Sequence, residues 1–518
     1  MSALSVLMLG WEFPPFITGG LGTACHGLTR ALKQAGCDVT FVLPRAVDHT
    51  HASHVRLVSP EGLATQCSSC DGGWSPAPLA RIIESTADAS TSIDFHPSDS
   101  PASTRARHEA LLQGTPKRID ILRLGSTNQG VYGSVPYRLE ILRKSGAIVD
   151  EATGTSDPQT MVARLIAAGV EPARAWEQVV IDQVLPEAAT PPAHAPISLS
   201  GGYEGDLVLA AERYAQFCVQ SARDLNFDII HAHDWLTYPA GLALARLTGR
   251  PLVVHVHATE FDRSGTHVNQ QVYNIERRGM HGAVRIMAVS NLTRNLLVNR
   301  YGLSPNKIDV VYNGVELEPG SYGIKRIERG ERIVLYFGRI TMQKGPEYFV
   351  RAAKRVLEVE KNVRFVVAGS GDLASSMIEM AASLGIGGRM TFTGFLRGRD
   401  IPRVFSMADL YVMPSVSEPF GIAPLEAMGH RVPVIISRNS GVSEVLTHAL
   451  KVDFWDVDDM ANKIVAVLRH PPLRAELRDR GLFEVRGITW DGAAKRCIMS
   501  YQSAMSAVRR ISAGTRHA

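Results

Sequence analysis

Two carboxylates flank the start of a short apolar segment in "EPFGIAPLEA", which begins at Glu418 and reaches Glu426 before its last residue. The proline in this segment suits the first turn of a helix, where a missing N–H costs nothing. The backbone amides of Phe420, Gly421 and Ile422 precede that turn, and such amides bind anions. Each carboxylate can accept hydrogen bonds from a pair of hydroxyls. The segment therefore suits a ligand that carries phosphate and many hydroxyls, such as a nucleotide sugar; alternatively, Glu418 is a helix cap and Glu426 is stabilised by the helix dipole.

Two cations occur in "YFGRITMQKG", where Arg339 and Lys344 follow a short apolar run. A guanidinium and an ammonium on one loop can hold a diphosphate, the first as a planar fork and the second as a point charge. Surface loops are often basic, so the cations alone do not distinguish phosphate binding from an ordinary solvated loop.

A second glycine-rich loop lies near the start of the chain, in "GWEFPPFITGGLGTA", which contains Gly19 and Gly20. Glycines before a helix let backbone N–H groups approach an anion, although a flexible turn has the same composition. The loop departs from a dinucleotide-binding fingerprint, because the next apolar run ends in Pro44 and Arg45 without an acidic ribose ligand.

The elements that position these loops alternate between strand and helix. "SVLMLG", the helical "TACHGLTRALKQAG" and "CDVTFVLP" form one strand–helix–strand unit, and "FDIIHAHDW", "PLVVHVHA" and "RIMAVS" continue it. The pattern begins again near Arg332 with "RIVLYFGR", "GPEYFVRAAKRVLEV", "VRFVVAGSG", "MTFTGF", "DLYVMPS" and "VPVIIS". This order predicts an α/β protein with two doubly wound parallel sheets, and ligands bind beyond the carboxyl ends of such strands.

The predicted organisation has a first domain over residues 1–320 and a second over 321–488. A long insertion rich in Ser, Thr, Ala and Pro interrupts the first domain at about 46–205. The C-terminal segment 489–507 places apolar residues at helical spacing, and we expect this helix to pack back on the first domain.

Composition limits the classes of partner. Among 518 residues, 45% are hydrophobic and the net charge is only +4, with no block of basic residues, so neither a nucleic-acid groove nor an anionic membrane surface is expected. The start lacks a basic region with a cleavage site, and no apolar run has the length of a membrane span. Together with few cysteines, these features predict a cytoplasmic protein without a transmembrane segment.

Four motifs together resemble a known family. "EPFGIAPLEA", "GRITMQKG", "GGLGTA" and "VVYNGVE" are similar to segments of the retaining glycosyltransferases of the glycogen synthase and family 4 type, over about residues 1–45 and 206–505. The resemblance implies the GT-B fold, in which two Rossmann-like domains face each other across a cleft.

The resemblance also implies roles for single residues. Glu418 would hold the hydroxyls of the donor sugar and Glu426 those of the ribose, while Arg339 and Lys344 bind the diphosphate and Gly20 closes over it. His257 in "HVHATEFDRSG" corresponds to a histidine beside the transferred sugar, although a lone histidine is more often a satisfied core residue. The remaining residues of the expected site are Gly19, Phe420, Gly421 and Ile422 on the donor side and Asp234 of "HAHDWLTYPAG" on the acceptor side.

These roles predict transfer of a hexose, glucose foremost, from an ADP- or UDP-sugar to an α-glucan with retention of configuration. No cofactor and no metal are expected, because the nucleotide sugar is a substrate and the chain has no Asp-x-Asp motif. A sugar phosphate or a lipid-linked sugar is an alternative acceptor. A sugar-nucleotide epimerase, a dehydrogenase and a non-catalytic sugar-nucleotide-binding protein are alternatives of other classes.

Overall fold

The structure is a computed structural model that describes residues 3–14, 19–45, 54–59, 129–130, 133–134, 206–222, 225–317 and 330–514. The predicted insertion at 46–205 lies outside these residues except for the short pieces given above, and so does the predicted boundary at 320. Two parallel sheets account for most of the described strands.

The first sheet has seven parallel strands in the order β3-β2-β1-β6-β7-β8-β9. Their bounds are β1 Ser5–Leu9, β2 Asp38–Val42, β3 Arg56–Val58, β6 Ile229–His233, β7 Leu252–Val256, β8 Arg285–Ala288 and β9 Ile308–Val310. The register pairs His233 of β6 with His255 of β7. Every residue of β6 and β7 is buried, as expected for central strands of a sheet that is covered on both faces.

The second sheet has six parallel strands in the order β12-β11-β10-β13-β14-β15. Their bounds are β10 Arg332–Phe337, β11 Val363–Ala368, β12 Met390–Gly394, β13 Leu410–Met413, β14 Val434–Ser437 and β15 Leu450–Val452. A separate two-stranded hairpin joins β4 Gln129–Gly130 to β5 Gly133–Ser134. The prediction of two doubly wound parallel sheets is therefore confirmed.

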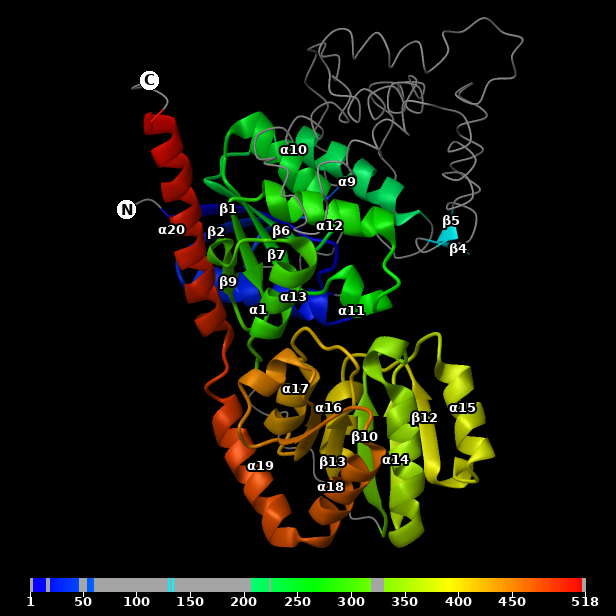
Figure 1. Cartoon of the computed structure of the whole chain (residues 1–518). Coiled ribbons are helices and arrows are strands. Elements are labelled where there is room, and N and C mark those ends of the chain that lie inside the picture. The colour runs from blue at the N-terminus through cyan, green and yellow to red at the C-terminus, as the bar shows by residue number, and fades with distance from the viewer. Residues whose placement is uncertain are drawn as a thin grey trace, which may run out of the picture.

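The helices cover both sheets (Figure 1). Around the first sheet lie α1 Gly20–Gln34, α9 Leu207–Ser221, α10 Tyr238–Thr248, α11 Glu260–Ser264, α12 Gln270–Gly282, α13 Asn291–Tyr301 and the 3₁₀ turn η4 Pro305–Lys307. Around the second lie η6 Met342–Lys344, α14 Pro346–Val359, α15 Ala374–Ser383, η7 Gly387–Arg389, α16 Asp400–Met407, α17 Ala423–Gly429, η8 Gly441–Glu444, α18 Val457–Arg469 and α19 Pro471–Val485.

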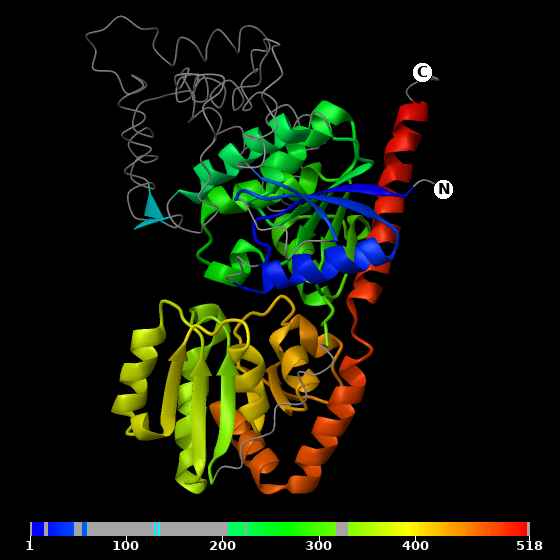
Figure 2. The same ribbon diagram turned by 180° about the vertical axis from the view of Figure 1, so that it is seen from behind.

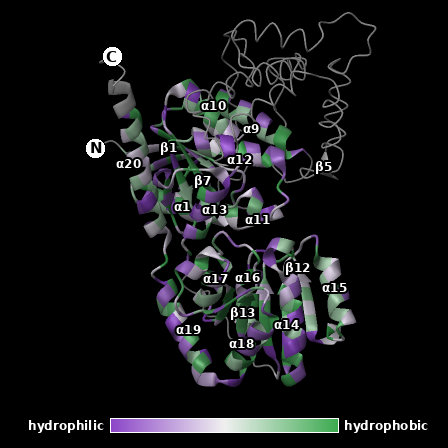
Figure 3. Ribbon diagram, viewed as in Figure 1, coloured by the Kyte–Doolittle hydropathy of each residue, from purple (hydrophilic) through white to green (hydrophobic). Residues whose placement is uncertain are grey.

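Local sequence explains these elements. Helix α14 follows Gly345, whose φ of 59° suits glycine, and Pro346 occupies its first position. Its buried residues recur at helical spacing, with Phe349 and Val356 among them. Figure 3 shows the result, because central strands such as β7 and β13 are hydrophobic while α14 and α19 carry hydrophilic stretches.

The last helix, α20 (Trp490–Gly514), leaves the second sheet and runs beside the first, as Figures 1 and 2 both show. Trp490, Cys497 and Tyr501 are buried in one cluster with residues of β1 and α1. A Cβ on Gly27 of α1 would lie 2.3 Å from the ring of Trp490, so this glycine allows the close approach of the two helices. The chain therefore passes between the two halves twice, before β10 and before α20.

Candidate active site between the two sheets

Lys344 and Glu418 form an ion pair at the carboxyl edge of the second sheet. Lys344 ends the turn η6 after β10, and Glu418 lies in the loop after β13. The Glu418 side chain is only 9% exposed and also accepts a hydrogen bond of 3.3 Å from the Ser415 hydroxyl. The structure therefore brings together two of the predicted site residues from loops 74 positions apart.

The predicted amides lie directly beside this pair. Among the described residues, no backbone hydrogen bond is donated by Phe420, Gly421 or Ile422. Gly421 has a φ of 103°, and a Cβ there would lie 3.2 Å from Cγ of Glu418. This position therefore favours glycine, and the loop leaves several amide donors available to an anion.

Glu426 lies in the first turn of α17 and faces the first half of the chain. It lines a cavity of about 80 Å³ together with Ile422, Trp490 and the α1 residues Thr23 and His26. Burial raises the pKa of the Glu426 carboxyl to about 7. The side chain thus lies at the interface between the two halves, where a ligand could reach it.

Arg339 and the two N-terminal glycines lie apart from these contacts. Arg339 is exposed after β10, and in the part of the chain that the structure describes its guanidinium makes no ion pair. Gly19 precedes α1 and Gly20 is its first residue, and a Cβ on either would meet no described residue within 4 Å. Packing inside the protein therefore does not explain either glycine, and the space beside them is open to a ligand.

His257 follows β7 and is partly exposed, whereas the ring of His233 is fully buried. Nδ1 of His233 lies 2.9 Å from Nε2 of His257, so the two imidazoles share a hydrogen bond. Burial lowers the pKa of His257 to about 3. The imidazole is therefore neutral over the whole physiological range of pH.

Asp234 fixes the backbone that carries His257. Its Oδ1 accepts hydrogen bonds from the backbone N–H groups of His257 at 2.7 Å and Ala258 at 3.4 Å. Asp234 has a φ of 56°, which is uncommon for a residue other than glycine and is found at sites that constrain the backbone. Burial raises the pKa of the Asp234 carboxyl to about 7, against the opposing charge of Arg263.

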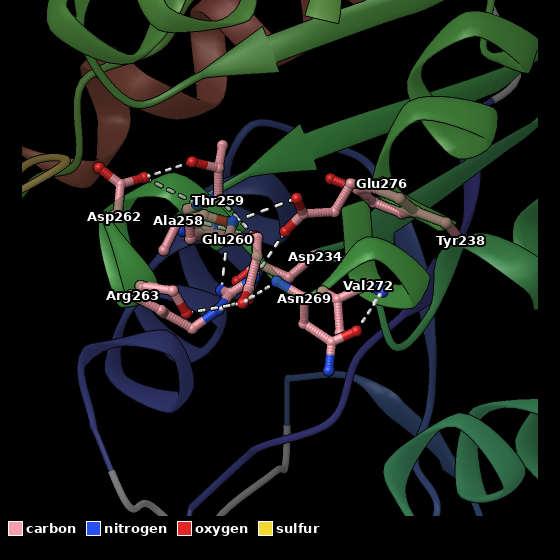
Figure 4. A network of polar contacts seen from close by, with 12 residues as sticks. Asp234, Tyr238, Ala258, Thr259, Glu260, Asp262, Arg263, Asn269, Val272 and Glu276 are labelled. Atoms are coloured by element: carbon pink, nitrogen blue, oxygen red, sulfur yellow. Dashed lines mark hydrogen bonds and ion pairs between the residues drawn. The ribbon is translucent and has the colours of Figure 1, made fainter. Parts of the chain in front are cut away.

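A buried ionic network continues from this loop, as Figure 4 shows. Arg263 of α11 donates to Glu260 at 3.2 Å and to Glu276 of α12 at 2.5 Å. The exposed fractions of Glu260 and Glu276 are 0% and 2%, so both carboxylates depend on the guanidinium for compensation. The network holds α11 against α12 directly beyond His257.

One hydrogen bond joins the two halves at this point. The Ser417 hydroxyl donates to Oδ1 of Asp262 in α11 at 2.7 Å, while Oδ2 of the same carboxylate accepts from the backbone N–H and the hydroxyl of Thr259. Ser417 immediately precedes Glu418, and Thr259 follows His257 by two residues. The loop of Glu418 and the loop of His257 therefore face each other across the interface.

Known proteins share both the sequence segments and the fold. A family model described as glycosyl transferases group 1 matches residues 323–482, one described as Glycosyltransferase Family 4 matches 187–319, and one described as starch synthase catalytic domain matches 5–84. Sucrose-phosphate synthase from Thermosynechococcus elongatus superposes with a TM-score of 0.60 at 15% identity, over 97% of this chain and 100% of the other. The chain has the GT-B fold, and its sequence matches glycosyltransferase family models over three separate segments.

Other relatives of this glycosyltransferase carry different names. An uncharacterised glycosyltransferase of Methanocaldococcus jannaschii is 29% identical over 306 residues, which are 55% of this chain and 77% of the relative. A D-inositol 3-phosphate glycosyltransferase of Kribbella flavida is 29% identical over 339 residues, which are 59% of this chain and 80% of the relative. The structure of Anabaena HepE in complex with UDP and glucose has a TM-score of 0.54 at 15% identity, over 96% of this chain and all of the other.

Sequence interpretation of the glycosyltransferase missed several residues that support the site. His233, Asp262, Arg263 and Ser417 were not singled out, although His233 bonds to His257, Ser417 precedes Glu418, Asp262 accepts from Ser417, and Arg263 belongs to the network beside them. A signal for His233 was present in "HAHDW" and "HVHA", because the period of two in a strand places the two histidines of each motif on one face. Ser417 and Asp262 carry no such signal, since their contact depends on how the two halves dock.

Three buried histidines of the glycosyltransferase have the composition of a metal site. His231, His233 and His255 offer ring nitrogens within 4.8 Å of one another. Hydrogen bonds within the protein engage both ring nitrogens of His231, with the Tyr501 hydroxyl 2.6 Å from Nδ1 and with Nδ1 of His255 3.3 Å from Nε2. A zinc ligand must offer a free lone pair, which His231 does not do in this arrangement.

The described helices also bear on membrane association. Among them, none combines the length and the apolar character that crossing a bilayer requires.

Proposed function

We propose that this glycosyltransferase moves a hexose, glucose foremost, from an ADP- or UDP-sugar to an acceptor with retention of anomeric configuration. The observation that carries the proposal is the hydrogen bond between Ser417 and Asp262, because it brings the Lys344–Glu418 pair to the loop of His257. A sugar held at this point lies between a carboxylate from one half and an imidazole from the other.

The nucleotide-sugar donor fits the loops at the carboxyl edge of the second sheet. Lys344 and the exposed Arg339 supply positive charge for a diphosphate, and the amides of residues 420–422 supply donors beside it. Glu418 accepts from hydroxyls of the transferred sugar, and Glu426 accepts from the ribose. Gly19 and Gly20 leave the backbone of the first half free to approach the phosphates.

The chemistry follows from these positions. In the proposed step, the bond between the anomeric carbon and the diphosphate oxygen breaks while the acceptor hydroxyl bonds to the same face of that carbon, and the departing phosphate takes the acceptor's proton. The protein then has to stabilise charge on the β-phosphate and align the acceptor. Glu418 already binds Lys344 and Ser415, so its surroundings suit hydroxyl binding better than nucleophilic attack. The step needs neither a metal nor a cofactor.

An α-glucan is the first candidate acceptor. Residues 5–84, which include β1 and α1 at the interface, match the starch synthase catalytic domain, and this match supports a glucan on the first half. A phosphorylated polyol is the second candidate, since relatives at 26% to 31% identity are named D-inositol 3-phosphate glycosyltransferases.

The test is a matrix of donors and acceptors. The purified full chain is incubated with ADP-, UDP- and GDP-hexoses, each with glycogen, with inositol phosphate or without acceptor, and nucleotide release is measured. We expect release from an ADP- or UDP-sugar that rises with one acceptor, and loss of that rise in Lys344→Met. The proposal is wrong if no sugar nucleotide is bound or turned over, or if a donor is converted to its epimer without transfer.

A further inference from the structure

Four histidines of the first half form a continuous stack, which we call the histidine stack: His231, His233, His255 and His257. The ring centroids of His231 and His233 are 4.2 Å apart, and those of His255 and His257 are 4.4 Å apart. His257 alone is partly exposed, and it lies two residues before Thr259, which bonds to Asp262. The other three rings are buried in the protein.

The hydrogen bond inside the stack requires one proton between two nitrogens. Either Nδ1–H of His233 donates to Nε2 of His257, or Nε2–H of His257 donates to Nδ1 of His233; the nitrogens are 2.9 Å apart. The two cases differ at the far side of His233, where Nε2 is buried and has no partner among the described residues. In the first case this atom is a bare lone pair, whereas in the second it is a buried N–H without an acceptor.

A buried N–H without an acceptor is the rarer and costlier of the two states. The proton of His233 therefore belongs on Nδ1, and His233 donates to Nε2 of His257. Because burial keeps His257 neutral, its single remaining proton must then lie on Nδ1. No described residue bonds to Nδ1 of His257, so this N–H is available to a ligand.

We propose that His233 is a positioning residue, which fixes His257 as the Nδ1–H tautomer so that His257 donates a hydrogen bond to an oxygen of the transferred sugar. The proposal rests on the function proposed above for the identity of the ligand, but the tautomer itself does not depend on it. His257 in this state orients the transferred sugar through a hydrogen bond and exchanges no proton with it. Substitution of His233 should therefore affect the chemical step through His257 alone.

Nitrogen NMR tests the tautomer without any substrate. The full chain is labelled with ¹⁵N-histidine, and the ring signals of His257 and His233 are assigned by their loss in His257→Ala and His233→Asn. We expect Nδ1 of His257 to show the shift of a protonated ring nitrogen and Nε2 that of an unprotonated one. The reverse pattern at His257, or a mixture of both tautomers, overturns the proposal.

Kinetics test the positioning role. His233→Leu should lower kcat by about 10- to 100-fold with little change in donor KM, since a bond that matters only in the transition state is lost. His233→Asn should recover kcat to within about 3-fold, because its amide N–H can replace Nδ1–H. His255→Leu is the matched control: it removes a buried ring that stacks on His257 but makes no hydrogen bond to it.

Comparison of His233→Leu with His255→Leu distinguishes a positioning role of His233 from a role in packing alone. We expect His255→Leu to lower the melting temperature as much as His233→Leu does while kcat stays within about 3-fold of wild type. In the His257→Ala background, His233→Leu should have no further effect on kcat, because residues that act as one unit are not additive. Equal losses of kcat in His233→Leu and His255→Leu, or additive losses with His257→Ala, contradict the proposal. If wild type turns over no sugar nucleotide, the proposed function fails and the NMR result alone decides the tautomer.

Discussion

The two sides of the interface differ in whether their polar groups are bonded within the protein. On the first half, Asp234, Glu260, Arg263 and His257 all bond to protein neighbours, and Glu260 is fully buried. On the second half, Arg339 is exposed and the amides of residues 420–422 donate no described backbone bond. The first side is therefore a rigid template, while the second leaves the charge of Arg339 and the amide donors of residues 420–422 for a ligand. Changes on the first side should cost stability or kcat, and changes on the second should cost donor binding.

Removal of α20 should have the largest effect, because this helix packs against the first half of the chain. A chain that ends after Gly487 loses Trp490, Cys497 and Tyr501 from the core shared with β1 and α1. Full burial of one such side chain contributes about 1.5–3 kcal/mol, and an entire domain is stable by only about 5–15 kcal/mol. We expect sugar transfer to be abolished and the first half to unfold at much lower urea concentration.

Nucleotide binding by the second half should partly survive this truncation, as measured by calorimetry, since its contacts come from residues 339–426. A chain that ends after Gly514 is the control and should behave as the full chain. A protein truncated at Gly487 that stays folded and transfers sugar at the full rate would show that α20 is dispensable.

Arg263→Met should be the next largest change and should act on stability. It leaves the carboxylates of Glu260 and Glu276 buried without a cation, and breaking such a pair costs about 3–5 kcal/mol. Urea unfolding measures the loss. Arg355→Met is the control, because this arginine is 54% exposed and its ion pairs with Glu358 and Asp458 should be worth less than about 1 kcal/mol. If both variants lost similar amounts of unfolding free energy, the buried network of Arg263 would be no more important for stability than the exposed ion pairs of Arg355.

His257→Ala should lower kcat by about 100-fold while the donor KM changes little, because a group that stabilises the transition state is removed from the template. His470→Ala, at an exposed histidine, is the control. A fully active His257→Ala enzyme would make His257 an ordinary core histidine.

Glu426→Ala should act mainly on donor binding. A ribose contact is made about equally in the ground and transition states, so we expect the donor KM to rise about 10-fold with a smaller fall in kcat. Glu379→Ala, at an exposed glutamate of α15, is the control. An unchanged donor KM would limit Glu426 to the start of α17.

The raised pKa of Glu426 makes the stability of the folded chain depend on pH. The folded chain holds this proton up to about pH 7, whereas the unfolded chain releases it near the ordinary pKa of glutamate. The resulting stabilisation is complete below the ordinary pKa and is lost as the pH rises through 7. In Glu426→Gln, the free energy of unfolding measured with urea should therefore fall less steeply between pH 5 and 7. A smaller fall should remain, because the raised pKa of Asp234 contributes to the same pH dependence. An unchanged pH slope would mean that the carboxyl is ionised throughout this range.

Glu444→Gln should have the smallest effect. Glu444 of η8 accepts from the backbone N–H groups of Asn291 at 2.9 Å and Leu292 at 2.7 Å, at the start of α13 in the other half. Because Glu444 is exposed, the charge lost should cost no more than about 1 kcal/mol. Glu358→Gln is the control for an exposed carboxylate. A loss above 3 kcal/mol in thermal unfolding would show that this contact dominates the docking of the two halves.

Periodicity was enough to predict both sheets, the helices α1 and α14, and the loops after β10 and β13, because parallel strands and amphipathic helices leave strong local patterns. The partner of Lys344 could not be predicted, since Glu418 lies 74 residues away. The stack of His233 on His255 depends on the register of β6 against β7. The contact of Glu444 with Asn291 spans 153 residues and depends on how the halves dock, which no local pattern encodes.

The stereochemistry of transfer tests the central claim most directly. The full chain is given an α-configured nucleotide sugar and the acceptor found in the donor–acceptor matrix, and proton NMR records the anomeric signal of the first product formed. Attack on the face from which the phosphate departs, with Glu418 bound to hydroxyls, predicts an α-linked product from the earliest time point. A β-linked first product would contradict the account, because it requires attack from the opposite face.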